Sequence, residues 1–155
     1  MLTKNGFSLL EILLIMGILV ILVTVVSSSF ISYQVVVEAD EEANRIRSLL
    51  RSAQGKAINF EENSQWGVHF SNPSSGSPLY ELFTGSSYPG TVKETIYLSP
   101  RFIFTNPAIG ATQDVIFQKR SGKNTNATTI IITITPASGQ NQTRNISVTG
   151  EGNIQ

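Results

Sequence analysis

A single carboxylate, that of Glu11, lies inside an otherwise apolar stretch near the start of the chain. The stretch runs from Phe7 to Val26 and holds 20 residues (FSLLEILLIMGILVILVTVV). As a helix rising ~1.5 Å per residue it would be about 30 Å long, the thickness of a bilayer's hydrocarbon core. A carboxylate inside a membrane-spanning helix costs roughly 2.5–3.5 kcal/mol by insertion scales. Glu11 is therefore the residue whose position most needs a functional explanation.

Other reactive groups are scarce. The 155 residues include no cysteine, which excludes disulfides, thiolate nucleophiles and cysteine-ligated metals. The single histidine, His69, makes a histidine-rich metal site or a histidine-dependent triad very hard to assemble within one chain. The sequence contains neither the G-x-S-x-G motif of serine hydrolases nor the phosphate-binding G-x-x-x-x-G-K-[ST] motif. We therefore predict that the protein is not an enzyme and needs no cofactor.

The charge composition does not indicate a particular class of binding partner. Eleven basic and eleven acidic residues leave a formal net charge of zero, so no global field favours nucleic acid or an acidic membrane surface. The basic loop cluster Lys119, Arg120 and Lys123 is interpreted as a solvated turn, because electrostatic binding to nucleic acid needs several phosphate contacts. Two clusters of acidic residues lack the ligand spacing of a calcium-binding loop. They are Glu61–Glu62 and Glu38–Asp40–Glu41–Glu42. The cluster at 38–42 is expected on the water-facing side of a helix.

One long helix is predicted to position Glu11. No proline interrupts residues 7–60, and the composition changes from uniformly apolar to amphipathic after Ser27–Ser29. From Ala39 onward, small and apolar side chains recur at alternating steps of four and three, which is the spacing of one helical face: Ala39, Ala43, Ile46, Leu50, Ala53, Ala57 and Phe60. The opposite face is predicted to be solvated and holds Asp40, Glu41, Arg45, Arg47, Arg51 and Lys56.

The remainder is predicted to be all β. Seven short β-branched or aromatic runs are separated by turn-rich segments, at residues 66–70, 79–83, 92–98, 101–105, 114–119, 128–135 and 144–149. This spacing indicates an antiparallel sandwich or a curled sheet. The run TTIIITIT (128–135) is predicted to be a central strand and RNISVT (144–149) an edge strand. Trp66 is expected to anchor the core, and His69 to point to one face of its strand.

Four interpretations of the N-terminus remain at this point. A plain membrane anchor and a secretory signal peptide cut near Ser27–Ser29 both explain the apolar run, but neither explains Glu11. A proton or ion pathway through Glu11 normally needs more polar groups and a second span. The fourth interpretation comes from the motif itself: Gly6, then Phe7, then a hydrophobic run with a glutamate at the fifth position after the glycine. This pattern resembles the N-terminal signature of type IV pilins and pseudopilins.

The resemblance implies a specific processing reaction. A prepilin peptidase would cut between Gly6 and Phe7 on the cytoplasmic side and would methylate the new amino group of Phe7. Glycine suits a cut site because a residue without a side chain lets the protease approach the backbone closely. By the same resemblance, the carboxylate of Glu11 would meet the amine of Phe7 on a neighbouring subunit during assembly. Pairing would offset the cost of burying either charge alone.

The soluble half narrows the choice of family member. The order of long helix, WGVHF (66–70), YELFTGSSYPGTVKETIYLSP (80–100) and a strand-rich tail resembles the GspH/FimT-like pseudopilin domain. Such proteins are minor subunits of a type II secretion pseudopilus or a type IV pilus. FimT-like members that bind DNA have a basic C-terminal motif, whereas this chain ends TGEGNIQ with Glu151 and no arginine. No nucleic-acid partner is therefore expected.

The predicted organisation is an α+β, pilin-like chain with four segments. These are a leader (1–6), a transmembrane and filament-core helix (7–28), its amphipathic continuation (29–60) and a β-rich domain (61–155). The expected location is the inner membrane, single-pass, with the soluble domain outside the cytoplasm, and then the pilus or pseudopilus. The expected partners are prepilin peptidase, other pilin subunits, the inner-membrane assembly platform and membrane lipid. The alternative is a membrane-anchored β-sandwich that binds a ligand without polymerising, including a FimT-like role in DNA uptake.

Overall fold

The computed structural model describes residues 8–126, 128–137 and 142–155, with the side chains of residues 25–32 left aside. Its one α-helix, α1, spans Leu9–Ile58 and 50 residues, which confirms the predicted long helix. The helix ends earlier than expected, because Phe60 adopts a left-handed backbone conformation with φ of 61°. The chain divides into two compact units, Met1–Val36 and Val37–Gln155.

The first unit contains the apolar part of α1. Its described side chains, from Ser8 to Thr24, are all exposed. Within the described residues, no helix combines the length and the apolar character needed to cross a membrane.

In the described residues of the second unit there are seven strands, one for each of the seven predicted runs. They are β1 (Trp66–Asn72), β2 (Leu79–Thr84), β3 (Thr91–Tyr97), β4 (Phe102–Asn106), β5 (Ala111–Phe117), β6 (Ile130–Pro136) and β7 (Arg144–Val148). A short 3-10 helix, η1 (Glu61–Asn63), connects α1 to the strands. The largest difference from the prediction is at β5, which begins three residues before Asp114 because Ala111 and Asn72 pair at the end of the β1–β5 ladder.

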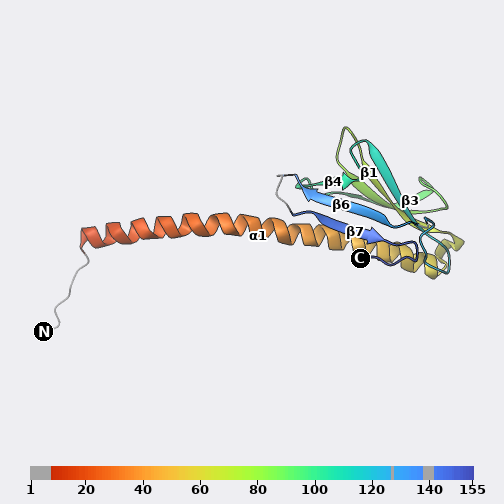
Figure 1. Ribbon diagram of the computed structural model, residues 1–155, viewed down its shortest axis with the longest axis horizontal. Coiled ribbons are helices and arrows are strands. Elements are labelled where there is room, and N and C mark those ends of the chain that lie inside the picture. The colour runs from red at the N-terminus through yellow and green to blue at the C-terminus, as the bar shows by residue number, and fades with distance from the viewer. Residues whose placement is uncertain (1–7, 127, 138–141) are drawn as a thin grey trace. The chain divides into compact units, whose positions relative to one another are not determined.

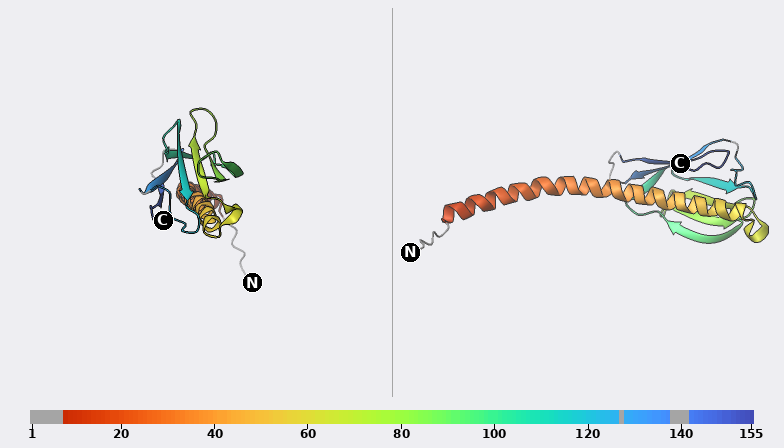
Figure 2. Two further views of the ribbon diagram at one scale, coloured as in Figure 1. Left: turned by 90° about the vertical axis from the view of Figure 1, so that its right-hand side faces the viewer. Right: turned by 90° about the horizontal axis from the view of Figure 1, so that it is seen from below.

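The strands form two antiparallel sheets. One has the order β3-β2-β1-β5 and the other the order β4-β6-β7. Strand β6 is central and β7 is at an edge, as predicted. Figure 1 shows β7 beside the second half of α1, and the end-on view in Figure 2 (left) shows the green and blue strands on different sides above the yellow end of that helix. The predicted α+β fold, with a helix packed on antiparallel β-sheet, is confirmed.

One hydrophobic core joins the second half of α1 to both sheets. The predicted helix face lies in this core, with no exposed surface at Ala39, Ala43, Ile46, Leu50, Ala53 and Ala57. Phe60 was wrongly assigned to this face, because it follows the end of the helix and is half-buried. The four alanines have small side chains that allow close approach of the helix to the strands, and Ile46 and Leu50 lie in the same core cluster as residues of both sheets. Trp66, as expected, is buried in the same core.

Two ion pairs fasten the beginning of this helical segment to the sheets. Arg144 Nε on β7 lies 2.6 Å from Asp40 Oδ1, and Arg101 Nη1 lies 2.6 Å from Glu38 Oε1. The hydrogen bond from Arg144 lowers the pKa of the Asp40 carboxyl below its usual value. Both pairs are partly exposed, and such pairs contribute at most about 1 kcal/mol each. They join α1 to β7 and to the residue that precedes β4.

Candidate functional site

Glu11 lies in the first turn of α1. The backbone N–H groups of Glu11 and Ile12 donate to the carbonyl oxygen of Ser8 at 3.0 and 3.2 Å, which starts the helix. A carboxylate in the first turn faces the positive end of the helix dipole, an interaction worth about 0.3–1 kcal/mol at an exposed site. The structure thus gives Glu11 a favourable local position, which the sequence did not predict. It leaves the carboxylate exposed and available to a partner.

The other two residues of the predicted site, Gly6 and Phe7, lie outside the described residues. The expected cleavage junction and the amine of Phe7 therefore have no described geometry. The expected contact of Glu11 with Phe7 is also intermolecular, so it remains a prediction about two subunits.

The apolar side chains on both sides of Glu11 form a continuous exposed surface. Leu9 is 81% exposed, and even the most covered of them, Ile15, is 44% exposed. Within this surface, Ile12, Ile15, Met16 and Leu19 line an open apolar hollow. Monomeric soluble proteins rarely expose apolar patches beyond a few hundred Å² unless the patch binds a partner. We define residues 9–23 as the apolar helix surface, and it is the chain's clearest interaction feature.

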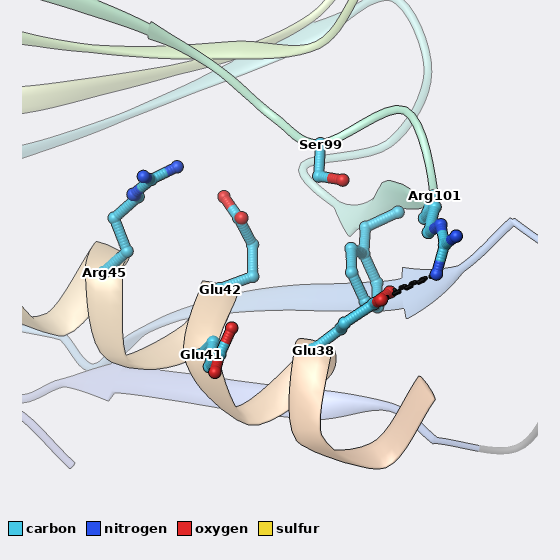
Figure 3. Close-up of a pocket in the computed structure, with 7 residues that line it drawn as sticks. Glu38, Glu41, Glu42, Arg45, Ser99 and Arg101 are labelled. Carbon is cyan, nitrogen blue, oxygen red and sulfur yellow. Dashed lines mark hydrogen bonds and ion pairs between the residues drawn. The ribbon is translucent and has the colours of Figure 1, made fainter. Parts of the chain in front are cut away.

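A second candidate is a polar pocket in the β-rich unit. It has a volume of about 350 Å³ and lies between α1 and the loop that joins β3 to β4 (Figure 3). Its lining combines three carboxylates, two guanidinium groups, a hydroxyl and one aromatic ring, from Glu38, Glu41, Glu42, Arg45, Ser99, Arg101 and Phe102. Figure 3 shows the carboxylate of Glu42 pointing into the space between α1 and this loop, with Arg45 and Ser99 on either side. We call this the helix–loop pocket.

Glu42 corrects the prediction that the acidic group at 38–42 faces water. Its side chain is buried, with only 7% of its surface exposed, and the hydroxyl of Tyr80 donates to its Oε1 at 3.2 Å. The sequence contained a signal for this. Glu42 follows Ala39 by three residues and precedes Ile46 by four, which is the spacing of the buried face. The partner Tyr80, 38 residues away, could not have been found from spacing.

His69 belongs to a polar cluster on the outer face of the four-stranded sheet. Its neighbours Val68 and Phe70 point into the core, while Glu81 and Asp114 lie opposite His69 on the two adjacent strands. His69 Nδ1 is 2.5 Å from Asp114 Oδ1. The ring of Tyr88 stacks on the imidazole with 3.6 Å between centroids and 7° between planes.

The cluster holds a loop in place. Tyr88 comes from the segment between β2 and β3, and its hydroxyl donates to Glu81 Oε2 at 2.6 Å. In the described part of the chain, the hydrogen bond of the His69 side chain joins it to Asp114. Its structural effect is to orient the imidazole that Tyr88 covers.

The Tyr88–Glu81 hydrogen bond predicts a pH effect on stability. The hydrogen bond to Glu81, helped by burial, raises the pKa of Tyr88 to about 12 from an ordinary value of 10.0. Because the unfolded chain loses this proton first, the contribution is complete below pH 10 and is lost as the pH rises toward 12. Urea denaturation followed by Trp66 fluorescence should show the free energy of unfolding falling less steeply over this range in Tyr88→Phe and Glu81→Gln than in the wild type. Identical slopes in all three proteins would contradict the assignment.

Each side chain of the basic loop cluster contacts another group of the same chain. Lys123 Nζ lies 2.6 Å from Glu151 Oε2, Lys119 Nζ donates to the carbonyl of Asn63 at 2.9 Å, and the guanidinium of Arg120 lies 4.8 Å from the centroid of Phe60. These contacts fit the interpretation of a surface turn. The acidic pair at 61–62 is likewise paired with Lys56 and Lys93. Among the described residues, no group of three or more His, Asp or Glu side chains is arranged to hold a metal ion.

Comparison with known proteins identifies the fold. No protein-family model and no curated protein matches this sequence. Two crystal structures of FimU, a type IV minor pilin of Pseudomonas aeruginosa strain PAO1, are similar to the structure. The form in space group P65 aligns with a TM-score of 0.54 at 12% identity, over 75% of this chain and 90% of FimU. The form in space group P21 aligns with a TM-score of 0.57 at 13% identity, over 76% of this chain and 87% of FimU. The chain therefore has a pilin fold, like that of a type IV minor pilin.

Proposed function

We propose that the protein is a pilin-like structural subunit of the GspH/FimT-like type. Prepilin peptidase cuts it between Gly6 and Phe7 and methylates Phe7, and the mature chain joins a type IV pilus or a type II secretion pseudopilus as a minor subunit. One observation supports this above all. A helix with the exposed apolar surface 9–23 continues into the core of a domain that has a pilin fold. The role is structural and not enzymatic.

The N-terminal motif supports the processing step. Gly6, Phe7 and Glu11 stand at the spacing of the prepilin signal, and Glu11 lies near the beginning of the apolar helix surface 9–23. Before assembly, the stretch 7–28 holds the chain in the inner membrane, in contact with lipid and with the assembly platform, and the β-rich domain lies outside the cytoplasm. This location rests on the apolar sequence of 20 residues from Phe7 to Val26.

The apolar helix surface supports the assembly step. Its side chains need an apolar environment, and the bundled helices of neighbouring subunits supply one once the chain leaves the lipid. Glu11 then pairs with the amine of Phe7 on another subunit. Among subunits packed in parallel, this contact selects one axial register, because a helix displaced by one turn would leave both charges buried and unpaired.

Intact-mass spectrometry tests the processing step. Co-expression with an active prepilin peptidase should give a chain that lacks residues 1–6 and has one added methyl group, whereas an inactive peptidase should leave the full chain. Gly6→Leu is the matched control and should stay uncut, because its side chain obstructs access to the backbone at the junction. A full-length chain with the active peptidase, or a cut near Ser29, would contradict the proposal.

A further inference from the structure

The helix–loop pocket contains a buried carboxylate, that of Glu42, which forms no direct ion pair within the described part of the chain. Glu42 is 7% exposed, and its only side-chain hydrogen bond in the described part of the chain comes from Tyr80. No lysine, arginine or histidine of the described residues lies within 4.0 Å of its oxygens, since none of the ion pairs involves Glu42. Buried charges in folded proteins are normally paired, because an uncompensated one is expensive.

Tyr80 does not supply the missing charge. It is fully buried. Burial, followed by the adjacent Glu42 carboxylate, raises the pKa of Tyr80 above its usual range, although the nearby Arg45 acts in the opposite direction. The phenol therefore stays protonated and neutral, and it donates one hydrogen bond to Glu42 Oε1. The hydrogen bond fixes the direction of the carboxylate without compensating its charge.

The other groups of the pocket leave an acidic surplus beside Glu42. Arg101 donates twice to the carboxylate of Glu38, at 2.6 and 2.8 Å, so these two charges compensate each other. Glu41 is exposed at the edge of the pocket and forms no ion pair in the described residues. Arg45, one helical turn beyond Glu42, is the remaining guanidinium of the lining. It is exposed and forms no ion pair with either carboxylate, although it lies near the Tyr80 hydroxyl that binds Glu42.

We propose that the helix–loop pocket receives a basic side chain, of arginine or lysine, from a neighbouring pilin-like subunit. The incoming cation pairs with Glu42, and the hydroxyl of Ser99 and the carboxylate of Glu41 lie at the pocket to receive its remaining N–H groups (Figure 3). The volume of about 350 Å³ leaves room for a guanidinium group and part of its aliphatic stem. That the basic side chain comes from a neighbouring subunit (its subunit origin) rests on the proposed function. That the pocket binds a positively charged group better than a neutral one (its cation preference) rests on Glu42 alone.

The two parts of the proposal predict different phenotypes. The cation preference is a property of the single chain and can be measured without any filament. The subunit contact adds a second link between subunits, in the β-rich domain and separate from the apolar helix surface. Loss of this contact should therefore weaken assembly without affecting processing at Gly6 and Phe7.

Two small molecules of similar shape, one positively charged and one neutral, test whether the pocket prefers a cation. The full chain in detergent micelles is titrated with N-acetyl-arginine amide and, separately, with the neutral analogue N-acetyl-citrulline amide, while backbone amide shifts are followed by NMR. The arginine probe should give saturable shifts at Glu42 and Ser99, and the citrulline probe should bind at least about tenfold more weakly. Equal binding of the two probes, or no saturable shift, would overturn the proposal.

Two variants assign the effect to Glu42. Glu42→Gln keeps an oxygen acceptor for Tyr80 but removes the charge, and it should lower the affinity for the arginine probe at least about tenfold. Glu94→Gln removes the same charge from an exposed position on the edge strand β3 and should bind like the wild type. Equal losses in both variants would overturn the assignment. Thermal denaturation confirms that both variants are folded.

Filament assembly then tests the origin of the side chain. In cells that assemble filaments, Glu42→Gln should be cut and methylated normally but should enter filaments at least about fivefold less than Glu94→Gln. If Glu42→Gln assembles like the control while its probe binding is lost, the neighbouring-subunit origin is wrong and the cation preference stands. If the wild type itself is absent from filaments, the proposed function fails independently of the probe result.

Discussion

Replacing Glu11 with glutamine is expected to lower the amount of this chain in filaments by about 100-fold or more. Removing one partner of a buried ion pair typically costs about 3–5 kcal/mol, because the other charge stays buried without compensation. In the proposed filament, the group left unpaired is the amine of Phe7 on a neighbouring subunit. A difference of 3 kcal/mol corresponds to roughly two orders of magnitude in an equilibrium.

The measurement compares filament and membrane fractions. Filaments are sheared from cells that express the assembly machinery, and the chain in each fraction is quantified by immunoblot. Glu11→Gln should accumulate in the membrane fraction in its cut and methylated form. The helix should tolerate the change, because glutamine and glutamate have similar helix propensities and the lost dipole interaction is worth only about 0.3–1 kcal/mol.

Glu94→Gln again provides the matched control. It removes one negative charge from an exposed strand of the same chain, and it should enter filaments at the wild-type level. Wild-type amounts of Glu11→Gln in filaments would show that Glu11 has no pairing role.

Leu50→Ala should destabilise the β-rich unit by about 2–5 kcal/mol, the range for large-to-small substitutions in a packed core. Leu50 has no exposed surface and lies in the core cluster shared by α1 and both sheets. The substitution removes apolar contacts to strands far away in the sequence and leaves a cavity beneath the helix. The expected loss is a large fraction of the roughly 5–15 kcal/mol stability of a typical domain.

Equilibrium urea denaturation of the full chain in micelles measures this effect. Trp66 is the only tryptophan and is buried in the same core, so its fluorescence reports unfolding of this unit. Arg51→Ala, at the adjacent exposed position, should change the free energy of unfolding by no more than about 0.5 kcal/mol. Similar losses for Leu50→Ala and Arg51→Ala would contradict the packing of α1 on the sheets.

The predictable part of the fold rests on periodicity. The 4-3 spacing from Ala39 to Ala57 identified the buried face of α1, because side chains at these steps share one side of a helix. The short β-branched runs identified all seven strands, and the nearly unbroken apolar character of β6 indicated its central position. The error at Phe60 arose at the helix end, where a left-handed residue terminates the pattern and periodicity no longer applies.

The contacts of the polar groups were not predictable, because they join distant segments. Glu42 meets Tyr80, and His69 meets Asp114 and the ring of Tyr88 only after the strands are placed in register. Strand alternation placed His69 on one face but gave no information about which side chain would cover it. Glu11 was recognised from its spacing to Gly6 and Phe7, whereas its place in the first helical turn required the helix start at Leu9.

The presence of this chain in purified filaments tests the central proposal most directly. Filaments from cells with a complete assembly machine are compared with the same preparation from cells that lack the assembly platform, and peptides of the β-rich domain are quantified by mass spectrometry. The proposal predicts that the chain, beginning at methylated Phe7, co-purifies with filaments only when the platform is present. A chain that is cut and methylated but stays in the membrane fraction while filaments form would contradict it, and would favour a membrane-anchored module that does not polymerise.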